Sequence, residues 1–196
     1  MRGKGYSDVL VAQGADGTAI TASTTETRLQ HSAARCVLPG GYFEAPAKTI
    51  EIWLRGRIST VVTTPGTLTL RLKLGSTVTT GTGAVTGGVS AWDSGAIALN
   101  TVAKTNVTFS LHLLLSSQVI GDGALAKLMG IGLLCSEALA GATAGQPLDF
   151  LLPASAPAQG TGFDSTASQS LDMSAQWSLN NADSIQSHLY VVKGLN

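Results

Sequence analysis

The chain has 196 residues, and its 12 lysines and arginines balance its 12 aspartates and glutamates, so the formal net charge is zero. Charged residues make up 12% of the sequence, against a usual value of about 25%, while hydrophobic residues reach 44%. This balance excludes the basic surface that nucleic-acid binding requires and the low hydrophobicity of a disordered chain. The apolar runs at residues 111–115 and 128–135 fall short of the roughly 20 residues that span a bilayer. We therefore expect one folded domain with neither a nucleic-acid nor a membrane partner.

The first 30 residues are polar and rich in threonine, which is typical of an extended arm with short strands. We predict that residues 1–30 form such an N-terminal arm and that residues 31–196 form the β-sandwich domain described below. No apolar segment follows the charged residues at the first positions, so we expect no signal peptide and folding in a cytoplasm. In that compartment Cys36 and Cys135 should be reduced and buried, without a disulfide between them.

Apolar and polar residues alternate over residues 50–58 and again over residues 68–74. A period of two is typical of a β-strand with one buried face. Pro65 and Gly66 stand between the two runs, in the positions that a tight turn favours. The sequence therefore predicts a long antiparallel hairpin with these residues on its apolar face: Ile50, Ile52, Leu54, Ile58, Leu68, Leu70, Leu72 and Leu74.

The opposite side of the first run carries Trp53, Arg55 and Arg57. An aromatic ring and two guanidinium groups on one face are candidate partner contacts, because tryptophan and arginine are enriched at protein interfaces. The same residues can instead keep an exposed sheet face soluble. The sequence leaves both interpretations open.

Residues 75–88 are rich in glycine and threonine, which indicates a mobile loop or a weak edge hairpin. Residues 81–87 approach the glycine pattern of dinucleotide-binding sites. Thr86 stands where the third glycine belongs, however, and no helix is predicted after it. We therefore interpret this segment as a loop and predict no cofactor.

Four further strands follow from the same alternation, at residues 107–115, 129–135, 171–179 and 184–192. In the second of these, we expect the side that carries Met129, Ile131, Leu133 and Cys135 to face the core. No stretch of helical length shows a sustained apolar stripe. The fold class predicted is all-β, a single-domain antiparallel β-sandwich of jelly-roll type.

Residues 141–162 form a long connection that contains Pro147, Pro153 and Pro157. Loops of this length are usually functional. Because the chain offers no catalytic group for such a loop to carry, we predict that these prolines mark contacts with a neighbouring protein.

A search for catalytic groups finds no convergent set. His31, His112 and His188 are scattered along the chain, and the nucleophile, zinc and redox motifs of common enzymes are absent from the sequence. We interpret the carboxylates in or beside turns as turn-forming and surface residues, although a pair of them could still meet in space: Asp149, Asp164, Asp172 and Asp183. We expect no enzyme activity, no catalytic residue, no cofactor and no metal site.

Three stretches of the sequence are similar to a group of small virion structural proteins of tailed bacteriophages. They are residues 56–70 (GRISTVVTTPGTLTL), residues 98–108 (ALNTVAKTNVT) and residues 152–167 (LPASAPAQGTGFDSTA). Residues 184–188 and 194–196 also fit, so the resemblance runs through most of the chain in order. It carries no chemical signature that could be transferred residue by residue.

The resemblance implies a non-catalytic component of the virion, assembled in the host cytoplasm. The preferred expectation is a capsid decoration or cement protein that reinforces contacts between major capsid proteins and forms a homo-oligomer, most simply a trimer. A tail or neck component is the alternative within the same class. A carbohydrate-binding sandwich is the alternative from another class, and it would need outward aromatic rings, for which the candidates are Trp53, Trp92 and Tyr190.

Overall fold

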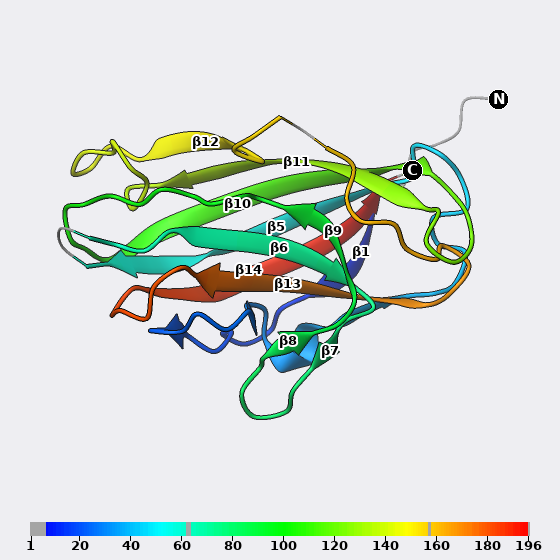
Figure 1. The fold of residues 1–196 in the computed structure, drawn as a ribbon, viewed down its shortest axis with the longest axis horizontal. Helices are drawn as coiled ribbons and strands as arrows, with labels where there is room; N and C mark the ends of the chain where they lie inside the picture. Colours follow the sequence, from blue (N-terminus) through cyan, green and yellow to red (C-terminus); the bar gives the residue numbers. More distant parts are fainter. Residues whose placement is uncertain (1–6, 62–63, 157, 196) are drawn as a thin grey trace.

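The computed structural model describes residues 7–61, 64–156 and 158–195, which fold into two antiparallel β-sheets packed face to face (Figure 1). The predicted all-β antiparallel sandwich is confirmed, while the jelly-roll assignment stays a prediction. Within these ranges the helical structure is the short η1 (Ser32–Ala34), and no helix is long and apolar enough to cross a membrane. Residues 1–6 of the predicted arm and Pro157 lie outside the described residues.

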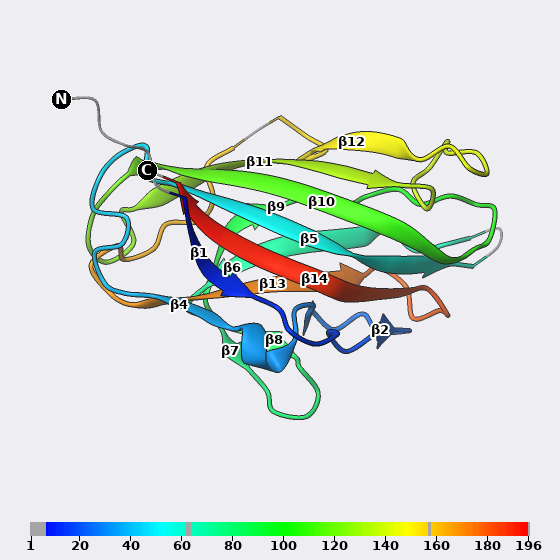
Figure 2. The ribbon, with the colours of Figure 1, turned by 180° about the vertical axis from the view of Figure 1, so that it is seen from behind.

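The larger sheet has seven strands and forms the layer that faces the viewer in Figure 2. Its strands follow one another across the sheet in this order: β1 (Ser7–Ala12), β14 (Ser184–Leu195), β5 (Thr49–Thr60), β10 (Lys104–Val119), β11 (Lys127–Ser136) and β12 (Leu148–Leu152). The short β2 (Ile20–Thr21) also pairs with β14. β12 is therefore the edge strand at one side of this sheet.

The smaller sheet has five strands and forms the other layer. Its order is β3 (Thr27–Arg28), β13 (Gln169–Trp177), β6 (Leu68–Leu74) and β9 (Val89–Asp93), with β4 (Cys36–Leu38) also paired to β13. The glycine-rich segment after β6 forms a separate two-stranded hairpin from β7 (Thr77–Val78) and β8 (Val85–Thr86). This matches the weak hairpin that the sequence allowed there.

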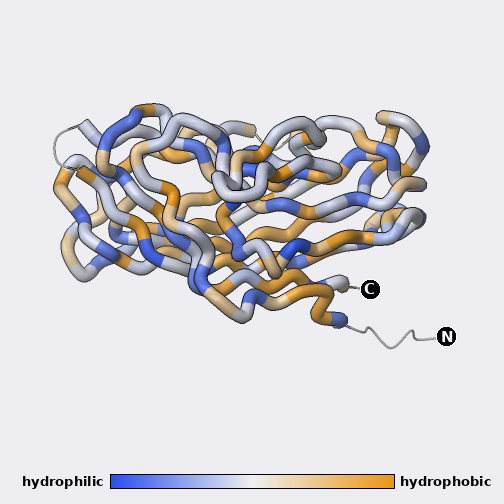
Figure 3. The backbone as a smooth tube through the Cα atoms, turned by 90° about the horizontal axis from the view of Figure 1, so that it is seen from below, coloured by the Kyte–Doolittle hydropathy of each residue, from blue (hydrophilic) through white to orange (hydrophobic). Residues whose placement is uncertain are grey.

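The core lies between the sheets and consists of the inward residues of each alternating strand. Figure 3 shows apolar and polar segments alternating along these strands. The eight apolar residues of the runs at 50–58 and 68–74 are all buried, as predicted. The largest side chains with almost no exposed surface include Trp177, Tyr190, Phe43 and Phe109.

The predicted hairpin between β5 and β6 is wrong, because the two strands belong to different sheets. β5 pairs with β10 and β14 in the larger sheet, while β6 pairs with β13 and β9 in the smaller one. The chain crosses from one layer to the other between them, so their apolar faces meet across the core. A hairpin and a crossing leave the same alternation in the sequence, and periodicity cannot separate them.

A buried carboxylate links this crossing to a second crossing between the sheets. The chain crosses again between β13 and β14, and Asp183 lies in that turn with no exposed surface. One of its carboxylate oxygens accepts a hydrogen bond from the backbone N–H of Val61, and the other accepts one from the N–H of Gly66, both at 2.8 Å. Asp183 therefore ties the connection after β5 to the turn before β14.

The segment from β1 to β4 runs along the edges of both sheets, since β1 and β2 pair with β14 whereas β3 and β4 pair with β13. This segment is extended and carries short strands, as predicted for residues 1–30. The expectation that these residues lie outside the core is wrong for the second half of that range. Ile20 and Leu29 are buried in the core, and the indole N–H of Trp177 donates to the carbonyl oxygen of Ile20 at 3.1 Å. Removing this segment would uncover apolar core.

The prediction of which side of strand β11 faces the core is wrong. Met129, Ile131, Leu133 and Cys135 lie on its outer side, and Gly130 and Gly132 face the core. The reason is the indole of Trp92: a Cβ at Gly130 would lie 2.6 Å from Trp92 Cδ1, and one at Gly132 would lie 3.2 Å from Trp92 Cζ2. Only glycine leaves room for this ring against the strand.

The two cysteines are free and lie in different environments. Cys36 is buried on β4, and burial raises the pKa of its thiol. Cys135 is half-exposed on the outer side of β11, which corrects the expectation that it is buried. A side-chain hydrogen bond to Asp149 is the main cause that raises the pKa of the Cys135 thiol, and burial raises it further.

The contact between Gly130 and Trp92 predicts a large cost for a small substitution. Gly130→Ala should lower the free energy of unfolding by about 1 to 3 kcal/mol, the usual cost of overpacking a well-packed core. Denaturant unfolding measures the change. Gly14→Ala is the control, because nothing lies within 4 Å of a Cβ at Gly14. Equal stability of the two variants would contradict the proposed role of the ring.

The buried carboxylate of Asp183 gives a second expected outcome. Asp183→Asn leaves one carbonyl oxygen for two backbone donors, so one of the buried N–H groups at Val61 and Gly66 loses its partner. The free energy of unfolding should fall by about 1 to 3 kcal/mol. Asp122→Asn, at an exposed turn, should leave it unchanged. Thermal or denaturant melts of the two variants test the difference.

Candidate functional site

The outer face of the larger sheet carries the contact residues that the alternation on β5 predicted. Trp53, Arg55 and Arg57 all lie on this face, with the two arginines exposed and Trp53 half-buried. The Arg57 guanidinium donates two hydrogen bonds, at 2.8 and 3.1 Å, to the side-chain oxygen of Gln186 on the neighbouring strand β14. The structure thus brings the three predicted residues together on one surface.

A polar cluster surrounds Trp53 on this surface. The indole stacks on the imidazole of His112, with ring centroids 4.0 Å apart and planes 10° from parallel, because the two residues are directly opposite on β5 and β10. The guanidinium carbon of Arg55 lies 5.0 Å from the Trp53 ring centroid. His112 Nε2 lies 2.8 Å from a carboxylate oxygen of Glu51. Trp53 is therefore held by its neighbours instead of standing free as a platform.

An apolar patch continues from this cluster toward the edge of the sheet. It consists of Leu114 on β10, Met129, Ile131 and Leu133 on β11, and Leu151 on β12, and these five residues are called the apolar patch below. Four of these residues are strongly exposed, with exposed fractions of 42% for Leu114, 46% for Ile131, 43% for Leu133 and 68% for Leu151. Together with His112 they line a shallow depression of about 380 Å³. Contiguous exposed apolar residues of this kind mark interaction surfaces.

The pairing of the strands makes the apolar patch continuous. His112 is opposite Leu133, and Leu133 is opposite Leu151, so these side chains form one row across three strands. Leu114 is opposite Ile131 in the adjacent row. Side chains directly opposite one another in a sheet are in contact distance. The apolar patch is thus a built feature of the sheet and not a set of scattered exposed residues.

The loop prolines lie at the two ends of the edge strand β12. Pro147 is exposed immediately before the strand, and Pro153 is half-exposed immediately after it. Pro157, the third predicted contact, lies outside the described residues. The structure thus places Pro153 close to Leu151 and Pro147 at the other end of the same edge strand.

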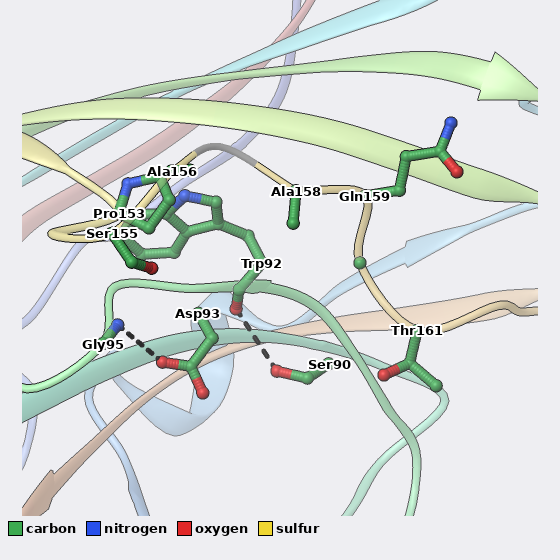
Figure 4. Close-up of a pocket in the computed structure, with 11 residues that line it drawn as sticks. Ser90, Trp92, Asp93, Gly95, Pro153, Ser155, Ala156, Ala158, Gln159 and Thr161 are labelled. Atoms are coloured by element: carbon green, nitrogen blue, oxygen red, sulfur yellow. Dashed lines mark hydrogen bonds between the residues drawn. The ribbon is translucent and has the colours of Figure 1, made fainter.

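Pro153 also lines a cleft of about 470 Å³ between β9 and the segment that follows β12 (Figure 4). Trp92 is on its inner wall and is almost fully buried. Asp93 is the one carboxylate among the described residues that line this cleft. Its oxygens accept hydrogen bonds from Arg71 Nε at 2.6 Å and from the N–H of Gly95 at 2.8 Å. Asp93 therefore stabilises the local fold and has no second carboxylate facing it for acid–base chemistry.

The three histidines do not converge. His31 Nδ1 accepts a hydrogen bond from the N–H of Ala33 at the start of η1, at 3.2 Å. His112 pairs with Glu51, and His188 Nδ1 lies 2.8 Å from a carboxylate oxygen of Asp16. Among the described residues, no group of three or more histidine, cysteine, aspartate or glutamate side chains is arranged to hold a metal ion.

The four carboxylates that the sequence places in or beside turns also lie apart from one another. Asp149 faces Cys135, and hydrogen bonds from Thr166 lower the pKa of Asp164. The expectation of a surface position is wrong for Asp172 and Asp183, which are both fully buried. Asp172 is buried because it accepts hydrogen bonds from Ser76 at 2.7 Å and Gln30 at 3.2 Å.

Sequence reasoning found the arginines and Trp53 but missed the apolar patch. The signal that could have found it is the glycine pair at Gly130 and Gly132, since two glycines on one side of a strand indicate a large ring packed against that side. The apolar residues between them must then point outward.

Comparison with protein-family models finds no match for this chain, and comparison with curated proteins finds none either. The surface chemistry of the outer face is what bears on its function.

Proposed function

We propose that this protein is a non-catalytic structural subunit of a tailed-bacteriophage virion, of the capsid decoration or cement kind, and that it acts as a homo-oligomer. The observation that carries the assembly role is the apolar patch on the outer face of the larger sheet. Burying these residues against a neighbour removes apolar surface from water, at about 25 cal/mol for each Å². An isolated chain leaves them exposed.

The occupant proposed for the apolar patch is a second copy of this chain. With zero net charge and 12% charged residues, two copies meet little long-range repulsion. The margins of the patch are polar, with Glu51 opposite Leu114 on the β5 side and Asp149 on β12. A surface that is apolar at its centre and charged at its rim has the anatomy of a protein interface. Three copies can each turn this face toward a threefold axis.

The virion assignment rests on the resemblance of residues 56–70, 98–108 and 152–167 to small virion proteins of tailed phages. In the decoration role, Pro147 and Pro153 beside the oligomer interface are the proposed contacts with the major capsid protein. A tail or neck position would use the same surfaces with another neighbour. The alternative of a carbohydrate-binding sandwich that stacks sugar rings on outward aromatic side chains loses support, because Trp92 and Tyr190 are buried and His112 stacks against Trp53.

The oligomer proposal predicts the effect of charge in the apolar patch. Light scattering at micromolar concentration should give a multiple of 20.0 kDa for the protein, with the trimer as the expected species. The double variant Ile131→Lys and Leu151→Lys should give 20.0 kDa and still unfold in one cooperative transition, since both side chains are exposed in the single chain. Its melting temperature should fall only by the contribution of the lost association.

Val37→Lys is the matched control, because Val37 is an exposed apolar residue of the other sheet. It should keep the oligomer. A monomeric native protein, or an oligomer that survives both lysines, would overturn the proposed interface.

The virion proposal is tested on the assembled particle. A cryo-electron map of the phage that encodes this chain should contain copies of the sandwich on the outer shell, with Leu133 and Leu151 covered by a neighbouring copy. Density at the tail or neck would select the alternative within the class. Absence of the chain from purified particles, measured by mass spectrometry, would refute both positions.

A further inference from the structure

A polar pocket of about 480 Å³ lies on the far side of the molecule from the apolar patch. Its walls come from two segments, residues 18–35 on one side and residues 78–83 of the β7–β8 hairpin on the other. Figure 1 shows this hairpin and η1 projecting together from the five-stranded sheet. The volume lies within the range of about 300 to 1,000 Å³ that small-molecule sites occupy.

Basic groups line this pocket without a carboxylate among its described lining residues. They are Arg28, His31 and Arg35. The Arg35 guanidinium is fixed from behind, because its Nη2 donates to the carbonyl oxygen of Ser76 at 2.7 Å and lies 3.5 Å from the buried carboxylate of Asp172. Part of the Arg35 side chain, 39% by area, stays exposed. One cation is thus held in place with donors left for a ligand.

Arg28 differs from Arg35 in that no hydrogen bond or ion pair joins its side chain to any of the described residues. It is opposite Ser174 on β13, so the two side chains lie on the outer side of the sheet. An unpaired guanidinium beside a cavity without an anion is a ready partner for an oxyanion. Its planar fork of N–H donors matches a carboxylate in two parallel hydrogen bonds.

Six further lining residues carry hydroxyl groups, namely Thr18, Thr27, Ser32, Thr79, Thr80 and Thr82. Thr27 and Thr82 already bond to backbone groups of Thr25 and Ala84. The loop tip turns through Gly81 and Gly83, which both adopt positive φ angles that favour glycine. The floor is rigid, because the Gln30 amide is buried and bonded to Asp172 and to the N–H of Met173. Many hydroxyls on a fixed frame suit a ligand that itself carries several hydroxyls.

From this arrangement we propose that the pocket binds a sugar acid, with its carboxylate held by Arg28 and Arg35 and its hydroxyls bonded to the threonine side chains. Arg28, His31 and Arg35 are gathered at this one pocket, whereas a nucleic-acid phosphate backbone needs an extended basic surface, which a chain of zero net charge does not offer. The site is independent of the oligomer interface, since it lies on the other sheet.

The test is a titration of the native protein with three probes, in which calorimetry or nuclear magnetic resonance measures the binding. D-glucuronate should bind at millimolar concentration or below, and D-glucose should bind at least about ten-fold more weakly. Inorganic phosphate can pair with the arginines but brings no sugar hydroxyls, so it should also bind at least about ten-fold more weakly than glucuronate. The ten-fold difference corresponds to the loss of one charge-assisted contact.

Two variants locate the binding. Arg28→Gln should weaken glucuronate binding by about ten-fold or more, because it removes the charge and the forked donor. Thr80→Trp should block binding by placing an indole at the pocket mouth without changing the charge. Lys127→Gln is the control, since it removes one positive charge from β11 of the other sheet and should leave the affinity unchanged.

Each contrary result overturns the proposal. Equal binding of glucose and glucuronate would remove the role of the carboxylate. Equal affinity of phosphate would make the pocket a general oxyanion site and not a saccharide site. No binding of glucuronate at millimolar concentration, or binding that survives both Arg28→Gln and Thr80→Trp, would show that this pocket is not a sugar-acid site.

Discussion

Two of the crossings between the sheets, from β5 to β6 and from β13 to β14, are the constraint on which the rest of the structure depends. β5 must leave the larger sheet and enter the smaller one as β6, and β13 must return to the larger one as β14. Backbone groups in such crossings lose the ladder partners that a sheet provides. The buried carboxylate of Asp183 replaces two of them, at Val61 and Gly66, and so holds both crossings at one end of the sandwich.

Packing inside the sandwich then determines the chemistry of its outside. The indole of Trp92 needs a flat wall, and Gly130 and Gly132 provide one only if they face inward. Since side chains on a strand alternate, the apolar residues Ile131 and Leu133 are forced to the surface. Their exposure is thus the direct consequence of fitting one large ring into the core, and the same arrangement lines up Leu133 with Leu151 on the edge strand.

The sequence predicts the strands well because alternation is a local property. The runs at residues 50–58 and 68–74 show which residues are buried, but not whether the strands share a sheet, since the partner of a strand is set by distant residues. The direction of β11 was ambiguous for another reason: apolar side chains and glycines are both compatible with a core, and only the position of Trp92 decides between them. The buried positions of Ile20 and Leu29 were missed because threonines surround them in a polar stretch.

Buried polar contacts explain why that stretch can pack at all. A chain segment rich in threonine has little apolar area to bury, so its attachment needs specific hydrogen bonds. Gln30 supplies them by bonding to Asp172 and to the N–H of Met173, and Arg35 adds an ion pair to the same carboxylate. This attachment covers the outer side of the smaller sheet with guanidinium and hydroxyl groups, while the larger sheet keeps the apolar patch on its outer face. The two faces are therefore suited to different partners, and a copy of the chain bound at the apolar patch leaves the polar pocket open to a small ligand.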